Sequence, residues 1–164
     1  MRRAMTGISL AGVLLSVAAP AAAGPNALGC FTRTYDRAHL ARHPDQLITA
    51  LKLLIHKPPP PDTNTRKYYW FRAQFNLRGR QETLRTSGFC TEQESGLRCI
   101  VDCDGGGVDV VPRARDATMY LDRIRAGVCG GGEDENGEEL TGGKDDRVFR
   151  LDRVNDAACA GMKR

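Results

Sequence analysis

A stretch near the middle of the chain, from Gly88 to Val110, holds three of the six cysteines and an alternating apolar pattern. The apolar and cysteine positions fall on every second residue, namely Leu97, Cys99, Val101 and Cys103. A period of two is typical of a strand with one buried face. The flanking segments 95–96 and 104–107 are turn sequences, because glycine adopts positive φ without steric cost. The stretch therefore predicts a β-meander tied by disulfides, and it favours a β-rich fold for the whole chain.

The number and placement of the cysteines constrain the fold further. The six are Cys30, Cys90, Cys99, Cys103, Cys129 and Cys159. An even number in an exported chain predicts three disulfides, although the sequence alone leaves the pairing open. Metal ligation by cysteine is disfavoured, because no Cys-x-x-Cys motif occurs. The first and last cysteines bracket nearly all of the chain after residue 23, so we expect both ends of the domain to be tied down.

The first 23 residues have the features of a secretory signal peptide. Arg2 and Arg3 precede a thirteen-residue apolar run over residues 7–19, and three alanines come directly before Gly24. This run is shorter than the roughly 20 residues that span a bilayer. We expect residues 1–23 to be cleaved, residues 24–164 to form one β-rich domain, and the protein to be periplasmic or secreted with no membrane span.

Charge is unevenly distributed along the predicted mature chain. Eleven Lys or Arg face four Asp or Glu over residues 24–90, whereas eleven face sixteen from residue 91 onward, for a net charge of +2. A total this close to zero disfavours dedicated nucleic-acid binding. We expect strands from the two halves to be neighbours whose charges compensate. The alternative is a basic face for an anionic partner.

Other segments also have strand patterns. Residues 71–77 alternate cleanly between apolar and polar positions and give the strongest strand signal. Residues 47–55 also fit a strand, with Leu47, Thr49, Leu51, Leu53 and Ile55 on one face, but a buried helix stays open there. With weaker strands at 83–90, 118–124 and 147–153, about seven or eight strands are expected. We predict a mainly β fold, a small antiparallel β-barrel or sandwich with one short N-terminal helix, stapled by disulfides.

The predicted helix lies within residues 34–44 and carries the first candidate site. Thr34 or Asp36 is a suitable N-cap, and Pro44 ends the element. His39 and His43 stand four residues apart, which brings two imidazoles to one helical face and can hold zinc or copper. Against this, the residue before a proline is pushed out of the helical region. Surface or capping histidines are therefore the favoured interpretation.

A cationic and aromatic cluster is the favoured ligand-binding candidate. It comprises Arg66, Lys67, Trp70 and Arg72, all on or next to the predicted strand 71–77. An indole face beside cations can bind a sugar, a base or another aromatic group. The predicted partner is an anionic, aromatic or sugar ligand, or an envelope protein.

Acidic residues offer two weaker candidates. The segment 130–146 is rich in Gly and acids, and we expect a solvated loop there, with calcium binding as the alternative; its acids are Glu133, Asp134, Glu135, Glu138, Glu139, Asp145 and Asp146. Asp102 and Asp104 are separated by one residue and form a possible carboxylate pair for glycoside hydrolysis.

The residues favour a non-catalytic function. After residue 23 serine occurs only as Ser87 and Ser95, neither of them in a Gly-x-Ser-x-Gly motif, and the cysteines are expected to be oxidised. No cofactor fingerprint is present. We therefore predict an exported binding or inhibitor module. A cell-envelope hydrolase acting through Asp102 and Asp104 is one alternative, and a structural envelope protein is another.

Overall fold

The computed structural model describes residues 27–58, 68–102, 104–126 and 138–162. Its strands are β1 (Gly29–Thr34), β2 (Ile48–His56), β3 (Tyr68–Leu77), β4 (Thr83–Gln93), β5 (Gly96–Val101), β6 (Gly106–Pro112), β7 (Asp116–Ala126), β8 (Glu138–Thr141) and β9 (Val148–Val154). Two short helical elements accompany them, α1 (Arg37–Arg42) and the 3-10 helix η2 (Asp156–Met162).

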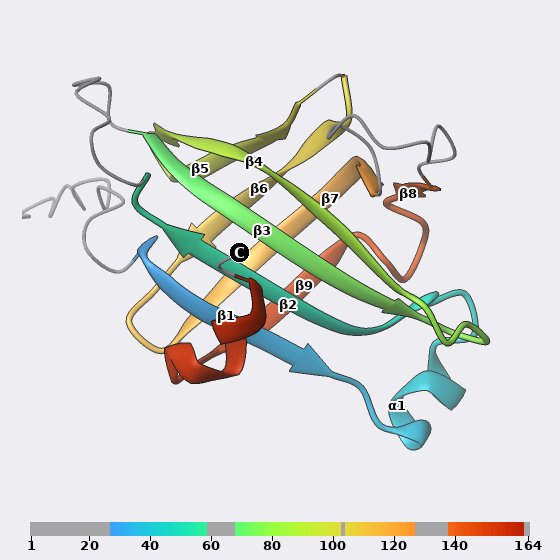
Figure 1. Cartoon of the computed structure of the whole chain (residues 1–164). Coiled ribbons are helices and arrows are strands. Elements are labelled where there is room, and N and C mark those ends of the chain that lie inside the picture. Colours follow the sequence, from blue (N-terminus) through green and yellow to red (C-terminus); the bar gives the residue numbers. More distant parts are fainter. Residues whose placement is uncertain (1–26, 59–67, 103, 127–137, 163–164) are drawn as a thin grey trace, which may run out of the picture.

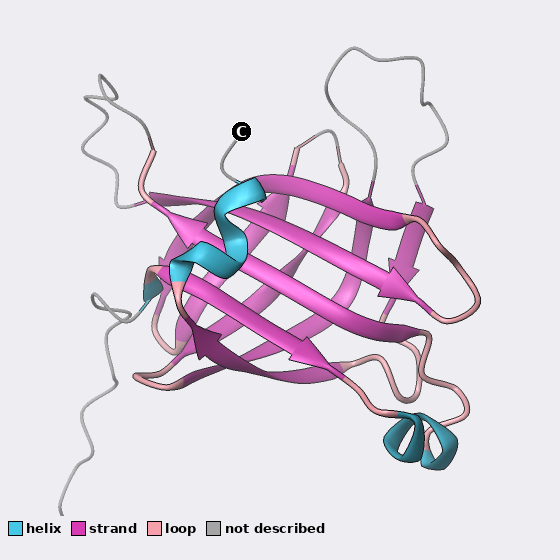
Figure 2. Ribbon diagram, turned by 60° about the horizontal axis from the view of Figure 1, so that its bottom comes forward, coloured by secondary structure: helices cyan, strands magenta, loops and turns pink. Residues whose placement is uncertain are grey.

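The strands close into an antiparallel barrel. The sheet order is β6-β5-β4-β3-β2-β1-β9-β7-β8, and an additional pairing of β6 with β7 closes the circle through eight of these strands. Strand β8 lies outside the circle and pairs with the C-terminal half of β7, whose N-terminal half pairs with β9. Figures 1 and 2 show the closed barrel, with α1 beyond one end and η2 against its outer side. The predicted β-rich fold is confirmed, and the barrel alternative is the one that forms.

The barrel interior is filled by apolar side chains. An eight-stranded barrel is just wide enough for inward side chains to fill it. The largest fully buried ones are Phe31, Phe71, Phe75, Phe149, Ile48, Leu51, Leu53, Leu54, Ile55, Leu97, Met119 and Leu121. Most of them belong to one core cluster, while Leu54 belongs to a second cluster described below. Side chains fill this interior, so a ligand has to bind at the outer surface of the barrel.

The segment 47–55 forms strand β2 and not a helix, but its predicted inner face needs one correction. Ile48 is 1% exposed and belongs to the core, whereas Leu47 is 55% exposed. The register of β2 against β3 shifts between Ile48 and Ala50. Such an irregularity inserts one residue and moves the alternation by one position. From Leu51 onward the predicted inner face is the one that packs in the core.

The meander around residue 90 is formed by β4, β5 and β6. Cys90 and Cys99 are directly paired across β4 and β5, and they form a disulfide inside the barrel. Strand β5 ends at Val101, and Asp102 already lies in a turn. The predicted strand is therefore shorter at its C-terminal end than the alternation suggested.

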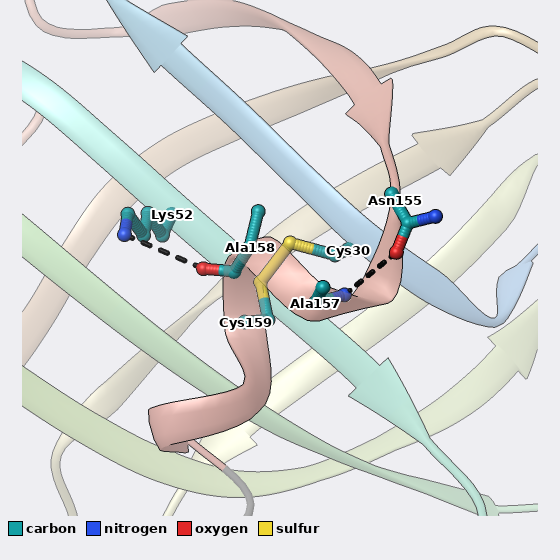
Figure 3. Close-up of a disulfide and its surroundings, with 6 residues drawn as sticks. All are labelled: Cys30, Lys52, Asn155, Ala157, Ala158 and Cys159. Carbon is teal, nitrogen blue, oxygen red and sulfur yellow. Dashed lines mark hydrogen bonds between the residues drawn. A yellow bond between two sulfur atoms is a disulfide. The ribbon is translucent and has the colours of Figure 1, made fainter.

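A second disulfide fastens the end of the chain to its first strand. Cys30 of β1 is bonded to Cys159 of η2, across 129 residues of sequence. Figure 3 shows this bond, with Lys52 Nζ donating to the Ala158 carbonyl at 3.4 Å. The two cysteines, Leu54 and Met162 form a small buried cluster on the outer side of the barrel. The expectation that both ends are tied down is confirmed, whereas η2 itself was not predicted.

The third predicted disulfide lies outside the described residues, because Cys103 and Cys129 do. We expect the protein to contain no free thiol when it is isolated from an oxidising compartment. Alkylation of the denatured, non-reduced protein should then leave its intact mass unchanged, while prior reduction should allow six additions, one for each cysteine. Two additions without reduction would contradict the three-disulfide prediction.

The charges of the two halves meet across the surface. Ion pairs join the basic first half to the acidic second half, namely Arg33–Asp152 and Arg80–Glu138. Exposed pairs of this kind contribute about 0–1 kcal/mol each. Their effect is to compensate charge between neighbouring elements, as the distribution along the chain led us to expect.

Candidate functional site

Three large apolar side chains stand in one row on the outer face of β3, β4 and β5. Trp70 is paired with Phe89, and Phe89 with Ile100. Their exposed fractions are 37%, 38% and 39%. Directly paired residues on one face lie roughly 5 Å apart, so the three side chains are neighbours. Together they form an apolar strip, which we call the Trp70 row.

Polar residues border the Trp70 row on both sides. One bordering line pairs Thr91 of β4 with Arg98 of β5, and Arg98 with Asp109 of β6. Arg98 Nη1 also donates to Asp109 Oδ2 at 3.0 Å. On the other side, Arg72 is paired with Ser87. The apolar strip is therefore one residue wide at Phe89 and Ile100, with hydrogen-bonding groups along its edges, while Tyr68 lies beside Trp70 on the same face.

The row continues onto β2 through His56. His56 is paired with Trp70, and the two rings meet edge to face with centroids 6.0 Å apart. His56 Nδ1 lies 2.9 Å from the Lys57 carbonyl, so this nitrogen carries the proton. His56 also lines a hollow of about 350 Å³, together with Leu28, Gly29, Leu54, Ile55, Lys57, Arg153 and Asp156.

A second hollow adjoins the opposite end of the row. It measures about 540 Å³ and is lined by Arg98, Ile100, Val101, Asp102, Asp104, Gly106 and Arg123. Ile100 belongs both to the Trp70 row and to this hollow. We call it the Ile100 hollow. The row thus connects the two hollows, through His56 at one end and through Ile100 at the other.

The predicted ligand cluster lies only partly within the described residues. Arg66 and Lys67 lie outside the described residues. Trp70 points outward from β3, and Arg72 stands two positions along the same face, half-buried. Sequence reasoning missed Phe89 and Ile100 as members of this surface. The available signal was their position next to buried cysteines, since residues adjacent to inward positions of a strand point outward.

His39 of α1 and the C-cap residue His43 lie together but are engaged with other groups. Asp36 is the N-cap, accepting from the backbone of His39 at 2.7 Å. The rings of His39 and His43 are stacked with centroids 4.3 Å apart. His39 Nε2 is 2.9 Å from Gln46 Oε1, and His43 Nδ1 is 3.7 Å from Asp145 Oδ1. Among the residues that the structure describes, no three His, Cys, Asp or Glu side chains gather as metal ligands would.

The predicted acidic loop is partly ordered structure, which corrects the expectation for residues 138–146. Residues 138–141 form β8, where Glu138 pairs with Arg80. Asp146 is not solvated, since it is 3% exposed and accepts from the backbone N–H groups of Leu47 and Ile48 at 2.6 and 3.2 Å. Burial raises the pKa of this carboxyl. The acids at 133–135 lie outside the described residues.

Asp102 and Asp104 both lie on the rim of the Ile100 hollow. Both side chains are exposed. Glycoside hydrolysis by two carboxyl groups needs one of them to stay protonated, and buried apolar surroundings usually achieve this. The exposed setting of these two acids suits hydrogen bonding to a bound molecule better than general acid catalysis.

Within the described part of the chain, no helix has the length and apolar character needed to cross a membrane. Comparisons with protein-family models, with curated proteins and with solved structures found no match for this chain.

Proposed function

We propose that this protein is an extracytoplasmic, non-catalytic carbohydrate-binding module that uses the Trp70 row. The observation that carries the proposal is the alignment of Trp70, Phe89 and Ile100 in one exposed line over a filled barrel. Scattered exposed apolar residues need no explanation, but a contiguous strip with a polar border is typical of a binding surface. The barrel supplies a rigid support for it.

The width of the strip favours a narrow ligand over a folded partner. A stable protein interface buries about 800 Å² on each partner, with an apolar centre several residues across. Here polar side chains such as Arg98 and Ser87 begin directly beside the row. A chain one sugar ring wide matches a strip one side chain wide.

Hydrogen bonding favours a sugar over an extended peptide. The backbone groups of β3, β4 and β5 are engaged in the closed sheet, so a peptide lying across them finds no strand edge to pair with. Its own N–H and C=O groups would then sit unpaired over apolar side chains. A sugar ring instead places its apolar C–H face on Trp70 or Phe89 and turns its hydroxyls to the polar borders.

The charges of the Ile100 hollow favour an uncharged sugar. The Ile100 hollow carries two arginines and two aspartates, Arg98, Arg123, Asp102 and Asp104. A lining with balanced charge produces little net attraction for either an anion or a cation. It offers both donors and acceptors, which hydroxyl groups need.

The extracytoplasmic location rests on the signal-peptide prediction and on the disulfides. Buried disulfides persist mainly in oxidising compartments, and two are present among the described residues. Polysaccharides of the cell envelope or of the surroundings are the abundant sugars there. Carbohydrate binding agrees with the predicted sugar partner. It requires neither a nucleophile nor a cofactor.

The chain provides its own reporter for the test, because Trp70 is its sole tryptophan. Neutral oligosaccharides built from glucose, mannose or N-acetylglucosamine should change the intensity and wavelength of Trp70 emission on titration. Calorimetry should show binding about tenfold weaker for Trp70→Ala, because the stacking face is lost. Trp70→Phe should retain most of the affinity, whereas Trp70→Leu should not.

Val148→Ala serves as the matched control, because Val148 is a 54% exposed apolar residue on β9 outside the row. It should bind as the wild type does, and melting curves should show that all variants are folded. Absence of binding to every sugar in the panel would refute the proposal, as would equal affinity in Trp70→Ala. Release of reducing ends that disappears in Asp102→Asn would establish the hydrolase alternative instead.

A further inference from the structure

The line of paired residues that contains the Trp70 row extends across six strands. In order from β2 to β7 it comprises His56, Trp70, Phe89, Ile100, Gly107 and Arg123, each paired with the next. We infer that the ligand is a linear, uncharged oligosaccharide several rings long that lies along this line, perpendicular to the strands, with one terminal ring in the Ile100 hollow. This inference rests on the proposed function.

The length of the line sets the length of the ligand. Neighbouring strands are about 4.8 Å apart, so five spacings from His56 to Arg123 give roughly 24 Å along the barrel surface. The aromatic residues occupy the first half of this distance. A mono- or disaccharide can cover Trp70 and Phe89 but cannot also reach Arg123.

Two glycines lie at the far end of the line, and Gly106 lines the Ile100 hollow. The position after Ile100 in the line is Gly107, which has no side chain to fill the space before Arg123. A Cβ atom at Gly107 would run into the carbonyl of Cys99, and Gly106 has a φ of +73°. The backbone itself therefore requires glycine here. Here β6 packs closely against both β5 and β7.

The two arginines of the hollow pair with carboxylates on adjacent strands. Arg98 is paired with Asp109 at 3.0 Å, and Arg123 Nη1 lies 3.7 Å from Glu139 Oε2. Asp102 and Asp104 border the same space. Arginine donates and carboxylate accepts, so a ring in the hollow can form hydrogen bonds of both kinds. Side chains already oriented in this way lose less entropy on binding.

A chain-length series tests the inference. Binding of oligomers from the monosaccharide to the hexasaccharide, in the series that binds the wild type, should strengthen with each added ring and level off once the line is filled. Arg123→Ala should weaken binding of the long oligomers about tenfold, as expected for loss of a hydrogen bond from a charged donor. The same variant should bind the disaccharide as the wild type does.

Arg125→Ala is the matched control, since Arg125 is an exposed arginine on the same strand outside the line. It should leave the affinity for every length unchanged. Binding that depends on Trp70 but not on chain length would overturn the inference while leaving the proposed function intact. So would equal effects of Arg123→Ala and Arg125→Ala on the hexasaccharide. Absence of any Trp70-dependent binding would instead refute the proposed function itself.

Discussion

Replacement of both Cys30 and Cys159 with alanine is expected to lower the free energy of unfolding by about 4–5 kcal/mol. The bond closes a loop across 129 residues. Its main effect is to restrict the unfolded chain, and this restriction grows with the logarithm of the loop length. Urea unfolding of the non-reduced proteins, followed by far-ultraviolet circular dichroism, measures the change.

The Cys90–Cys99 disulfide provides an internal comparison. All four cysteines are 0% exposed, so packing losses on replacement with alanine are similar. Cys90 and Cys99 are only nine residues apart in sequence, and chain entropy then gives a smaller loss of about 2–3 kcal/mol. Equal losses for the two pairs, or a larger loss for the short loop, would contradict this explanation.

Replacement of Asp146 with alanine is expected to destabilise the protein by about 2–4 kcal/mol, because two backbone N–H groups at the start of β2 lose their acceptor. The donors belong to Leu47 and Ile48, which lie 99 and 98 residues away in sequence. Asp146→Asn should cost less, since an amide oxygen still accepts. Chemical unfolding at neutral pH compares the three proteins.

The same carboxyl predicts a pH dependence. Burial raises the pKa of Asp146 above the usual value of 3.8 for this carboxyl, and the negative charge of Asp145 adds to the effect, although the two backbone donors and Arg78 act in the opposite direction. The folded state therefore binds this proton more tightly than the unfolded state. The stability of the wild type relative to Asp146→Asn should fall as pH rises from about 4 through the folded-state pKa, and then become constant. A difference that rises with pH over this window would contradict the assignment.

Local alternation was sufficient to predict most strands. The inward residues Phe71, Phe75, Phe149 and Leu151 are all buried as the period of two requires. Strand β8 escaped prediction because its four residues, Glu-Glu-Leu-Thr, have no alternating pattern and form a strand by pairing with β7. The register irregularity in β2 was not predicted for a related reason. It is a property of the pairing with β3 and not of the segment alone.

The candidate site was only partly predictable. Trp70 was identified from its aromatic and cationic neighbours in sequence, but its neighbours in space are Phe89 and Ile100, which come from two other strands. Their alignment depends on the register of two hairpins. Asp146 was assigned to a solvated loop because its composition is acidic and rich in glycine, and only a contact across the chain accounts for its burial.

Because β1 lies between β2 and β9, the barrel can close only after β9 has been synthesised. Strand β9 is the last strand to leave the ribosome or an export channel, so β1 keeps an unpaired edge until almost the whole chain has emerged. An open sheet with free edges is prone to wrong pairing. Closure of the barrel and oxidation of Cys30 with Cys159 must therefore be late events, and the native state cannot accumulate gradually from the N-terminus. A chain with this strand order can therefore pass through a channel in an unfolded form until β9 is released.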